Sequence, residues 1–369
     1  MIRPFTQMDE YSIFFVDHNF IIFFCELSKY SKTTIPTNYA SNVTNEVWYL
    51  DLSSSFNTAT PPWNKDVGMP IGYFFGASCV IPIDNSVFLV GGRMFIPNTA
   101  NINLGSSPVY VFNSNISLWT NPYIIGFNSS FKMRNQIQPV IDNYGKIYTF
   151  GGTNYTGFNV SSVDYNDMSI LDTTSMTWST LLISANAPPL ILSYTATLLP
   201  TGIIFQTFNT KNYNWSTKSA GGASIGSRVG HSAVLTPNGD IIIYGGAIWN
   251  NFIIPATPYI AKLDTSTWMW SIPNLSQIDS PQLCFHSAAL YRDYMIIAFG
   301  QIPSMSSISY FSLHNNLYIL DIKSYTWVTS FNSNQPTPNH LNNDFFYWNW
   351  KRQNQYPNFI PTPGTTDRI

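Results

Sequence analysis

Two short apolar runs joined by a polar turn recur along the chain, and the second run of each pair ends in glycine. The clearest copy is HSAVLTPNGDIIIYGG, residues 231–246. Runs of this length that are rich in Val, Ile and Tyr and bounded by turn residues predict strands. Asn238 and Gly239 are residue types that suit the tight turn between antiparallel strands. Each copy therefore predicts a β-hairpin. The glycines that end these hairpins are Gly91, Gly92, Gly151, Gly152, Gly245, Gly246 and Gly300.

A third and a fourth strand are predicted after each hairpin. A variable stretch leads to an apolar segment such as VYVF or MSIL, and an Asp or Asn then precedes a Trp by six residues. We expect the Asp or Asn to accept backbone N–H bonds in a tight turn, and the Trp to cover the next unit. The copy from Asp51 to Trp63 carries six extra residues. The repeated tryptophans are Trp63, Trp119, Trp178, Trp215, Trp270 and Trp327.

Six such units predict an all-β, six-bladed β-propeller over residues 10–330. A four-stranded unit cannot bury both of its faces alone, so the units must pack face to face around an axis. The remaining residues, 332–369, are rich in Asn, Pro and Gln and predict a flexible tail. The expected blades are residues 10–66, 67–122, 123–182, 183–219, 220–274 and 275–331.

Two units depart from the pattern. In unit four the hairpin runs straight into the Trp215 segment and leaves no room for a separate third strand, so we predict three strands there. The alternative is that residues have been lost from the sequence at this point. In unit one, Cys25 and Glu26 stand where the glycine pair is expected, and in the last unit Gly300 stands alone, which we interpret as loss of the second glycine.

The closure of the ring is not evident from the pattern. The first strand is expected near Tyr11 and the last near Val328, and no strand is evidently exchanged between the two ends. Closure then rests on side-chain packing alone, or on the aromatic segment 345–350 adding an edge.

The glycine pair and the Trp, recurring together in this order, resemble the kelch-repeat family over roughly residues 10–330. More closely, the chain resembles fungal kelch proteins with a galactose-oxidase-like propeller. The resemblance implies the propeller fold far more strongly than it implies a function, because propellers host many unrelated activities.

Charge and cysteine content exclude several classes of partner. Charged residues make up 10% of the chain and the net charge is −2, so neither nucleic acid nor anionic lipid is indicated. Acidic residues interrupt the apolar N-terminal stretch, which predicts neither a signal peptide nor a membrane span. We therefore expect a cytoplasmic monomer by default, or an extracellular or cell-surface protein if the sequence is truncated. Cys25, Cys79 and Cys284 are scattered, and are expected to be small buried residues.

An oxidase would need copper held by converging His and Tyr side chains. His231 and His286 occupy the same place in their repeats, within the shared sequence HSA, and Tyr194 stands at that place in unit four. A residue that recurs in register is interpreted as part of the scaffold, here as a hydrogen bond between blades. No cofactor, metal site or catalytic residue is predicted. The other histidines, expected in a turn, a loop and the tail, are His18, His314 and His340.

Arg134 and Arg228 each precede a hairpin glycine by seventeen residues and are the candidate binding residues. A repeated arginine can bind a partner's acidic group, or it can form an inter-blade salt bridge or carbonyl contact. Loops at residues 93–108, 153–167 and 301–316 vary while the strands do not, which is typical of binding surfaces. We therefore predict a non-catalytic module that binds another protein through the loops of one face. The alternatives are a secreted galactose-oxidase-like copper enzyme acting on carbohydrate, and a degenerate copy without function.

Overall fold

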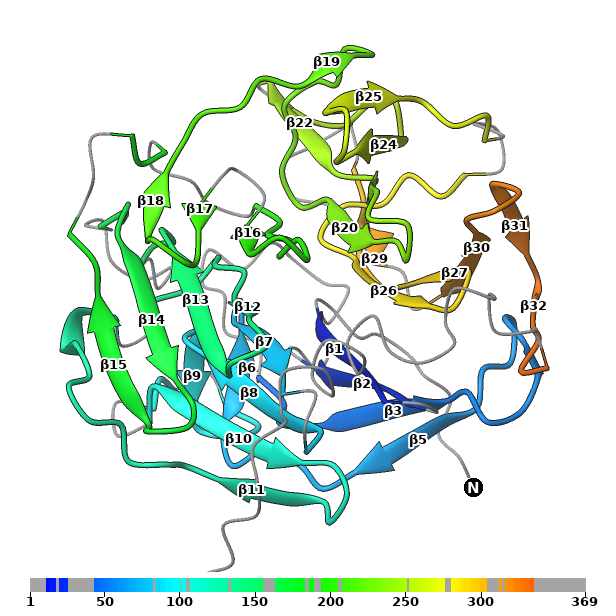
Figure 1. Cartoon of the computed structure of the whole chain (residues 1–369). Coiled ribbons are helices and arrows are strands. Elements are labelled where there is room, and N and C mark those ends of the chain that lie inside the picture. The colour runs from blue at the N-terminus through cyan, green and yellow to red at the C-terminus, as the bar shows by residue number, and fades with distance from the viewer. Residues whose placement is uncertain are drawn as a thin grey trace, which may run out of the picture.

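Six β-sheets stand around a central axis as the blades of a propeller (Figure 1). This confirms the all-β, six-bladed prediction, and the described residues contain only one short 3-10 turn, Ser129–Phe131. We number the blades I to VI in chain order. The computed structural model describes residues 11–17, 20–25, 43–81, 84–99, 101–103, 107–131, 134–154, 163–182, 186–188, 194–204, 208–250, 252–275, 280–303, 312–313 and 316–334.

Blades I to III each consist of four antiparallel strands, with the first strand at the axis and the last at the rim (Figure 1). Blade I contains β1 (Tyr11–Asp17), β2 (Phe20–Cys25), β3 (Val47–Asp51) and β5 (Trp63–Asp66). Blade II contains β7 (Ala77–Val80), β8 (Ser86–Val90), β10 (Val109–Asn113) and β11 (Leu118–Thr120). Blade III contains β12 (Val140–Ile141), β13 (Lys146–Phe150), β14 (Met168–Asp172) and β15 (Thr177–Thr180).

Blades V and VI have the same antiparallel arrangement, and a short parallel strand, β19 (Gly221–Gly222), pairs with the outer edge of blade V. Blade V contains β20 (Ser232–Leu235), β21 (Ile241–Tyr244), β24 (Ile260–Asp264) and β25 (Met269–Ser271). Blade VI contains β26 (Ser287–Tyr291), β27 (Tyr294–Ala298), β30 (Leu317–Asp321) and β31 (Thr326–Val328).

Blade IV has three strands, β16 (Ile203–Ile204), β17 (Phe208–Asn209) and β18 (Asn214–Trp215). The predicted number is confirmed, but the strand that was expected to be missing is present as β17. The first strand is the reduced one, because Leu198 makes only a single bridge to Ile204. In the described part of blade IV, a single bridge therefore stands where the other blades have their first strand.

The Asp or Asn of each repeat closes its turn as predicted. Asp172 Oδ1 accepts the backbone N–H groups of Thr174 and Ser175 at 3.0 and 3.1 Å. The side chain thus replaces a backbone acceptor in the turn between the third and fourth strands. Equivalent side-chain-to-backbone bonds form at Asp51, Asn113, Asn209, Asp264 and Asp321.

The paired glycines lie where neighbouring blades touch. Gly245 has φ +64°, and a Cβ on it would lie 2.3 Å from the Leu283 carbonyl oxygen of blade VI. Only glycine allows this approach without displacing the backbone. The N–H of Gly246 donates to the same carbonyl at 2.8 Å. The glycine pair is therefore a contact between blades as well as a strand end.

The last repeat lacks the first glycine, so its sequence interpretation was wrong. Phe299 has φ +63° and donates its N–H to the carbonyl of Asn316, just as Gly245 donates to Tyr259. Gly300 has φ +91°, the same value as Gly246. Phe299 therefore occupies the place of the first glycine, and Gly300 is the second.

The repeated tryptophans pack on the preceding blade, which corrects the prediction that they cover the next one. Trp327 of blade VI lies 5.5 Å from the Tyr244 ring of blade V, and Trp63 of blade I lies 5.5 Å from the Phe299 ring of blade VI. Six apolar clusters, one between each pair of neighbouring blades, contain all six tryptophans. A repeat shows that these residues share a face, but not which neighbour that face meets.

A short ribbon between the two ends of the ring joins blade VI to blade I. Strand β32 (Ser330–Phe331) pairs antiparallel with β4 (Phe56–Asn57). The extra residues of unit one, between Asp51 and Trp63, supply β4. We call this β4–β32 ribbon the clasp. Neither expected mode of closure accounts for it, and the aromatic segment 345–350 lies outside the described residues.

Candidate functional site

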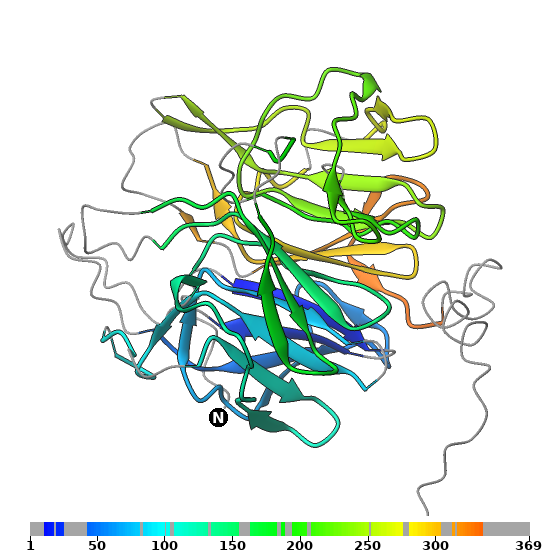
Figure 2. The same cartoon turned by 60° about the vertical axis from the view of Figure 1, so that its left-hand side comes forward.

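The two faces of the ring differ in their connections. Tight turns gather on one face, the turn face, and the connections between second and third strands gather on the other, the loop face; Figure 2 shows the turns toward the right and the longer connections toward the left. Three short ribbons stand on the loop face. They are β6 (Gly72–Phe74) with β9 (Arg93–Phe95), β22 (Ala247–Asn250) with β23 (Phe252–Pro255), and β28 (Gln301–Ile302) with β29 (Ser312–Leu313).

The bases of the loop-face connections are fixed by a repeated bridge. In blade V, Val229 and Ala247 exchange both backbone hydrogen bonds at 2.9 Å, so the chain entering the blade holds the residue that follows the glycine pair. The corresponding bridges in blades III and VI join Asn135 to Thr153 and Cys284 to Gln301. In these three blades the loop-face connections therefore start from backbone that is held by hydrogen bonds.

Arg134 is buried, and its charge is neutralised within its own blade. Its guanidinium forms an ion pair with Asp167 and lies 3.7 Å from the centre of the Tyr165 ring. A weaker bond reaches the Gly151 carbonyl at 3.4 Å. The side chain ties the end of the second strand to the start of the third, and its charge is not available to a ligand.

Arg228 holds the equivalent position in blade V without a carboxylate partner. Its Nη1 donates to the carbonyls of Gly245 and Pro258 at 3.0 and 2.8 Å. Pro258 stands two residues before the third strand of blade V, whereas Asp167 stands directly before the third strand of blade III, at the place that Tyr259 holds in blade V. Both arginines thus contact their own blade, Arg134 by an ion pair and Arg228 by carbonyl contacts, and among the described residues neither side chain forms a salt bridge to another blade. Among the described residues no acidic group pairs with Arg228.

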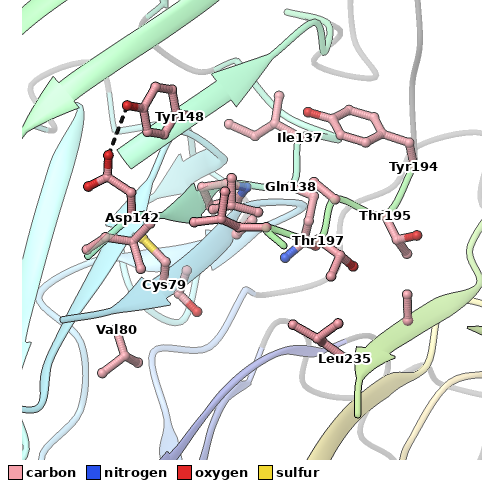
Figure 3. A pocket seen from close by; sticks show the side chains of 18 of the residues that line it. Cys79, Val80, Ile137, Gln138, Asp142, Tyr148, Tyr194, Thr195, Thr197 and Leu235 are labelled. Carbon is pink, nitrogen blue, oxygen red and sulfur yellow. Dashed lines mark hydrogen bonds between the residues drawn. The ribbon is translucent and has the colours of Figure 1, made fainter. Parts of the chain in front are cut away.

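A cavity of about 880 Å³ runs along the axis and is lined by residues of blades II to VI. Figure 3 shows Gln138, Thr195 and Thr197 on its wall, together with the apolar Leu235. At its turn-face end Asp142 accepts a hydrogen bond from the Tyr148 hydroxyl at 3.0 Å. Burial raises the pKa of Tyr148, so this phenol stays protonated.

Two lysines lie at the same end of the cavity. Lys146 Nζ lies 3.0 Å from the Tyr213 hydroxyl, and this hydrogen bond raises the pKa of Lys146. Lys211, on the neighbouring turn of blade IV, is exposed. The charged groups of the cavity wall therefore lie at one mouth.

Comparisons with known proteins agree with the architecture. Residues 200–349 match the family described as the KLHDC2/KLHL20/DRC7 Kelch-repeats domain. The Caenorhabditis elegans protein tag-53 is 26% identical over 302 residues, which are 75% of this chain and 21% of that protein. The structure titled "Structure of YjhT" superposes with a TM-score of 0.57 at 14% identity, covering 88% of this chain and 97% of that one.

This chain is a kelch-repeat β-propeller. It spans about a fifth of the length of tag-53, and the likeness to YjhT shows the fold alone. The fungal, galactose-oxidase-like character of the propeller stays a prediction.

The repeated histidines of the kelch propeller form hydrogen bonds between blades, as predicted. His231 Nε2 lies 3.0 Å from Thr195 Oγ1 of blade IV, and His286 Nε2 lies 2.8 Å from Ser232 Oγ of blade V. Tyr194 reaches back in the same way, donating to the Phe150 carbonyl of blade III at 2.6 Å.

Both imidazoles are neutral near pH 7. Burial lowers the pKa of His231 to about 4, and the nearby Arg228 charge lowers it further in the same direction. Burial likewise lowers the pKa of His286 to about 3, with a smaller effect from His231. Both histidines are therefore neutral hydrogen-bonding residues of the scaffold.

The remaining candidate chemistry is sparse. Within the described part of the chain no group of three or more His, Cys, Asp and Glu residues could hold a metal ion. Cys79 and Cys284 are buried free thiols, as expected, and burial raises the pKa of Cys79. The described residues include no helix long and apolar enough to cross a membrane. His18, His314, His340 and the side chain of Cys25 lie outside the described residues.

No feature of the sequence pointed to the cavity. Gln138, Thr195 and Thr197 are neutral polar residues in or near strands, and such residues are common on any exposed strand face. Only the ring, with a reduced inner strand in blade IV, brings them to one wall.

Proposed function

We propose that this kelch propeller is a non-catalytic module that binds a protein partner through its loop face. The observation that carries the proposal is the set of three ribbons on that face. Those of blades V and VI rise from a base fixed by a backbone bridge, and in blade II the ribbon β6–β9 itself joins the entering chain to the residues after the glycine pair. Variable connections held on a rigid scaffold are where binding residues concentrate. The kelch-repeat comparisons support a protein-interaction module in general terms.

Two residues of the loop face indicate which chemical groups a partner would present. Ile96 follows β9 on the loop face and is 47% exposed, so its side chain is accessible to a partner there. Arg228 carries a positive charge that no described carboxylate offsets. We expect the partner to place an apolar side chain near Ile96 and an acidic group near Arg228. Arg134 contributes no available charge.

The test uses two isoleucines of the same blade. Ile96 lies on the loop face, and Ile116, 65% exposed, lies in the turn between the third and fourth strands. A partner captured with the tagged chain is purified, and its affinity is measured for the wild type, Ile96→Asp and Ile116→Asp. We expect Ile96→Asp to weaken binding by about tenfold or more, as for a buried apolar contact, and Ile116→Asp to leave it within about twofold. Equal affinities for the two variants, or a larger loss with Ile116→Asp, would contradict the proposal.

A further inference from the structure

We propose that the axial cavity is a second binding site, for an uncharged small molecule that carries several hydroxyl groups, of the size of a mono- or disaccharide. The inference goes beyond partner binding by the loop face and does not depend on it.

The cavity has the dimensions of a small-molecule site. Its volume of about 880 Å³ falls in the range of roughly 300 to 1,000 Å³ that ligand pockets occupy. Residues of five blades line it, and it extends from Gln136 near the loop face to the turn at Tyr144. Blade IV contributes space at the axis, because the first of its strands is reduced to the bridge at Leu198.

The wall offers neutral donors and acceptors. The Gln138 amide can donate and accept at once, and the hydroxyl of Thr197 can do either. Both side chains are only half-buried, so a molecule inside the cavity can reach them. Leu235 and Val80 add apolar surface between these polar groups (Figure 3). A few placed polar groups on a largely apolar wall are typical of sites that fix a ligand's orientation.

The distribution of charge selects against ions. Among the described lining residues the charged side chains are Asp142, Lys146 and Lys211, all near the turn face. Asp142 is hydrogen-bonded to Tyr148, and Lys146 is hydrogen-bonded to Tyr213. A charged ligand in the middle of the cavity would lose hydration without meeting a free opposite charge, which is costly. A neutral polyhydroxylated ligand exchanges hydrogen bonds with water for hydrogen bonds with the wall.

Isothermal titration calorimetry with the full chain tests the proposal. The probes are glucose, galactose and lactose, with glucuronate and galacturonate as charged counterparts of the same rings. We expect at least one neutral sugar to bind with one-to-one stoichiometry and a Kd below about 10 mM, and its uronic acid to bind about tenfold more weakly.

A matched pair of threonine variants locates the site. Thr197→Val removes one hydroxyl from the cavity wall at constant shape, and Thr120→Val makes the same change on the exposed rim strand β11. We expect Thr197→Val to weaken sugar binding about three- to tenfold, as for one hydrogen bond, and Thr120→Val to have no effect. The proposal is overturned if none of the three sugars binds, if the uronic acids bind as well as the neutral sugars, or if the two variants bind alike. Thermal melts check that both variants are folded.

Discussion

Phe56 of blade I stacks on Phe331 at the end of blade VI, with ring centroids 5.0 Å apart. The backbones around them form the clasp, and the Thr58 N–H donates to the Thr329 carbonyl at 2.9 Å. Phe331 also packs on Tyr291 and Tyr294 of blade VI. One buried side chain therefore connects the first blade to the last.

Replacing Phe331 by alanine is expected to destabilise the whole ring. Phe331 is 1% exposed, and deleting a buried phenyl ring costs about 3–5 kcal/mol of unfolding free energy. Urea unfolding measures the change. Tyr123→Ala, at an 85% exposed position, is the control and should shift the unfolding free energy by less than about 0.5 kcal/mol. Similar values for both variants would show that closure does not depend on the clasp.

The equivalent arginines should differ in their contribution to stability. Arg134→Met leaves the Asp167 carboxylate without its ion-pair partner, and breaking such a buried pair costs about 3–5 kcal/mol. Arg228→Met removes the donor to the carbonyls of Gly226, Gly245 and Pro258 but leaves no charge unpaired, and we expect a loss of about 1–3 kcal/mol. Unfolding of both variants by denaturant measures which substitution lowers the unfolding free energy more. A larger loss for Arg228→Met would contradict the assigned contacts.

Substitutions at two glycines distinguish the cost of a close contact between blades from the cost of a left-handed backbone conformation. Gly239 and Gly245 both have positive φ, but a Cβ on Gly239 meets nothing nearer than Thr265 Oγ1 at 3.7 Å, whereas on Gly245 it meets a carbonyl at 2.3 Å. Gly239→Ala should cost about 1–2 kcal/mol for the left-handed conformation alone. Gly245→Ala should cost clearly more, or abolish folding, because blades V and VI must move apart. Thermal unfolding of the two variants distinguishes them, and equal costs would count against the inter-blade role of the pair.

Stability should fall as the pH falls below about 6.5. The unfolded chain protonates its histidines near pH 6.5, whereas His231 and His286 resist protonation in the fold down to pH values of about 4 and 3. The unfolded state therefore binds more protons between these limits, and each histidine removes up to about 2 kcal/mol of stability by pH 5.

Urea unfolding at pH 7 and pH 5 measures this loss. The double variant His231→Gln, His286→Gln should show a smaller loss than the wild type, since it has no such groups to titrate. An NMR titration provides the second check, and imidazoles that titrate near pH 6.5 in the folded protein would refute the prediction.

The repeat positions made the fold predictable. The Asp or Asn six residues before each Trp, and the hairpins ending in glycine, fix four strands and two turns in most units, and six units require a ring. Phe299 was misplaced because a phenylalanine at positive φ breaks the pattern that identifies the first glycine. Trp327 and its equivalents were predicted to cover the next blade, but they pack on the preceding one. Repetition shows which residues share a face, but not which blade that face meets.

Long-range pairing and the site were harder to predict. The clasp joins Phe56 to Phe331 across almost the whole chain, and two two-residue strands carry no periodicity. The extra residues before Trp63 were visible in the sequence, but their partner was not. At the candidate site, Arg134 and Arg228 look alike in sequence. What separates them is the acceptor just before the third strand, which is the Asp167 carboxylate in blade III and the Pro258 carbonyl in blade V.

Hydrogen–deuterium exchange of the chain, alone and with its captured partner, shows which face of the propeller the partner covers. If the partner binds the loop face, we expect slowed exchange in the loop-face connections at 93–103 and 247–255, and unchanged exchange in the turns at 113–118 and 264–269. Slowed exchange confined to the turns would contradict binding through the loop face.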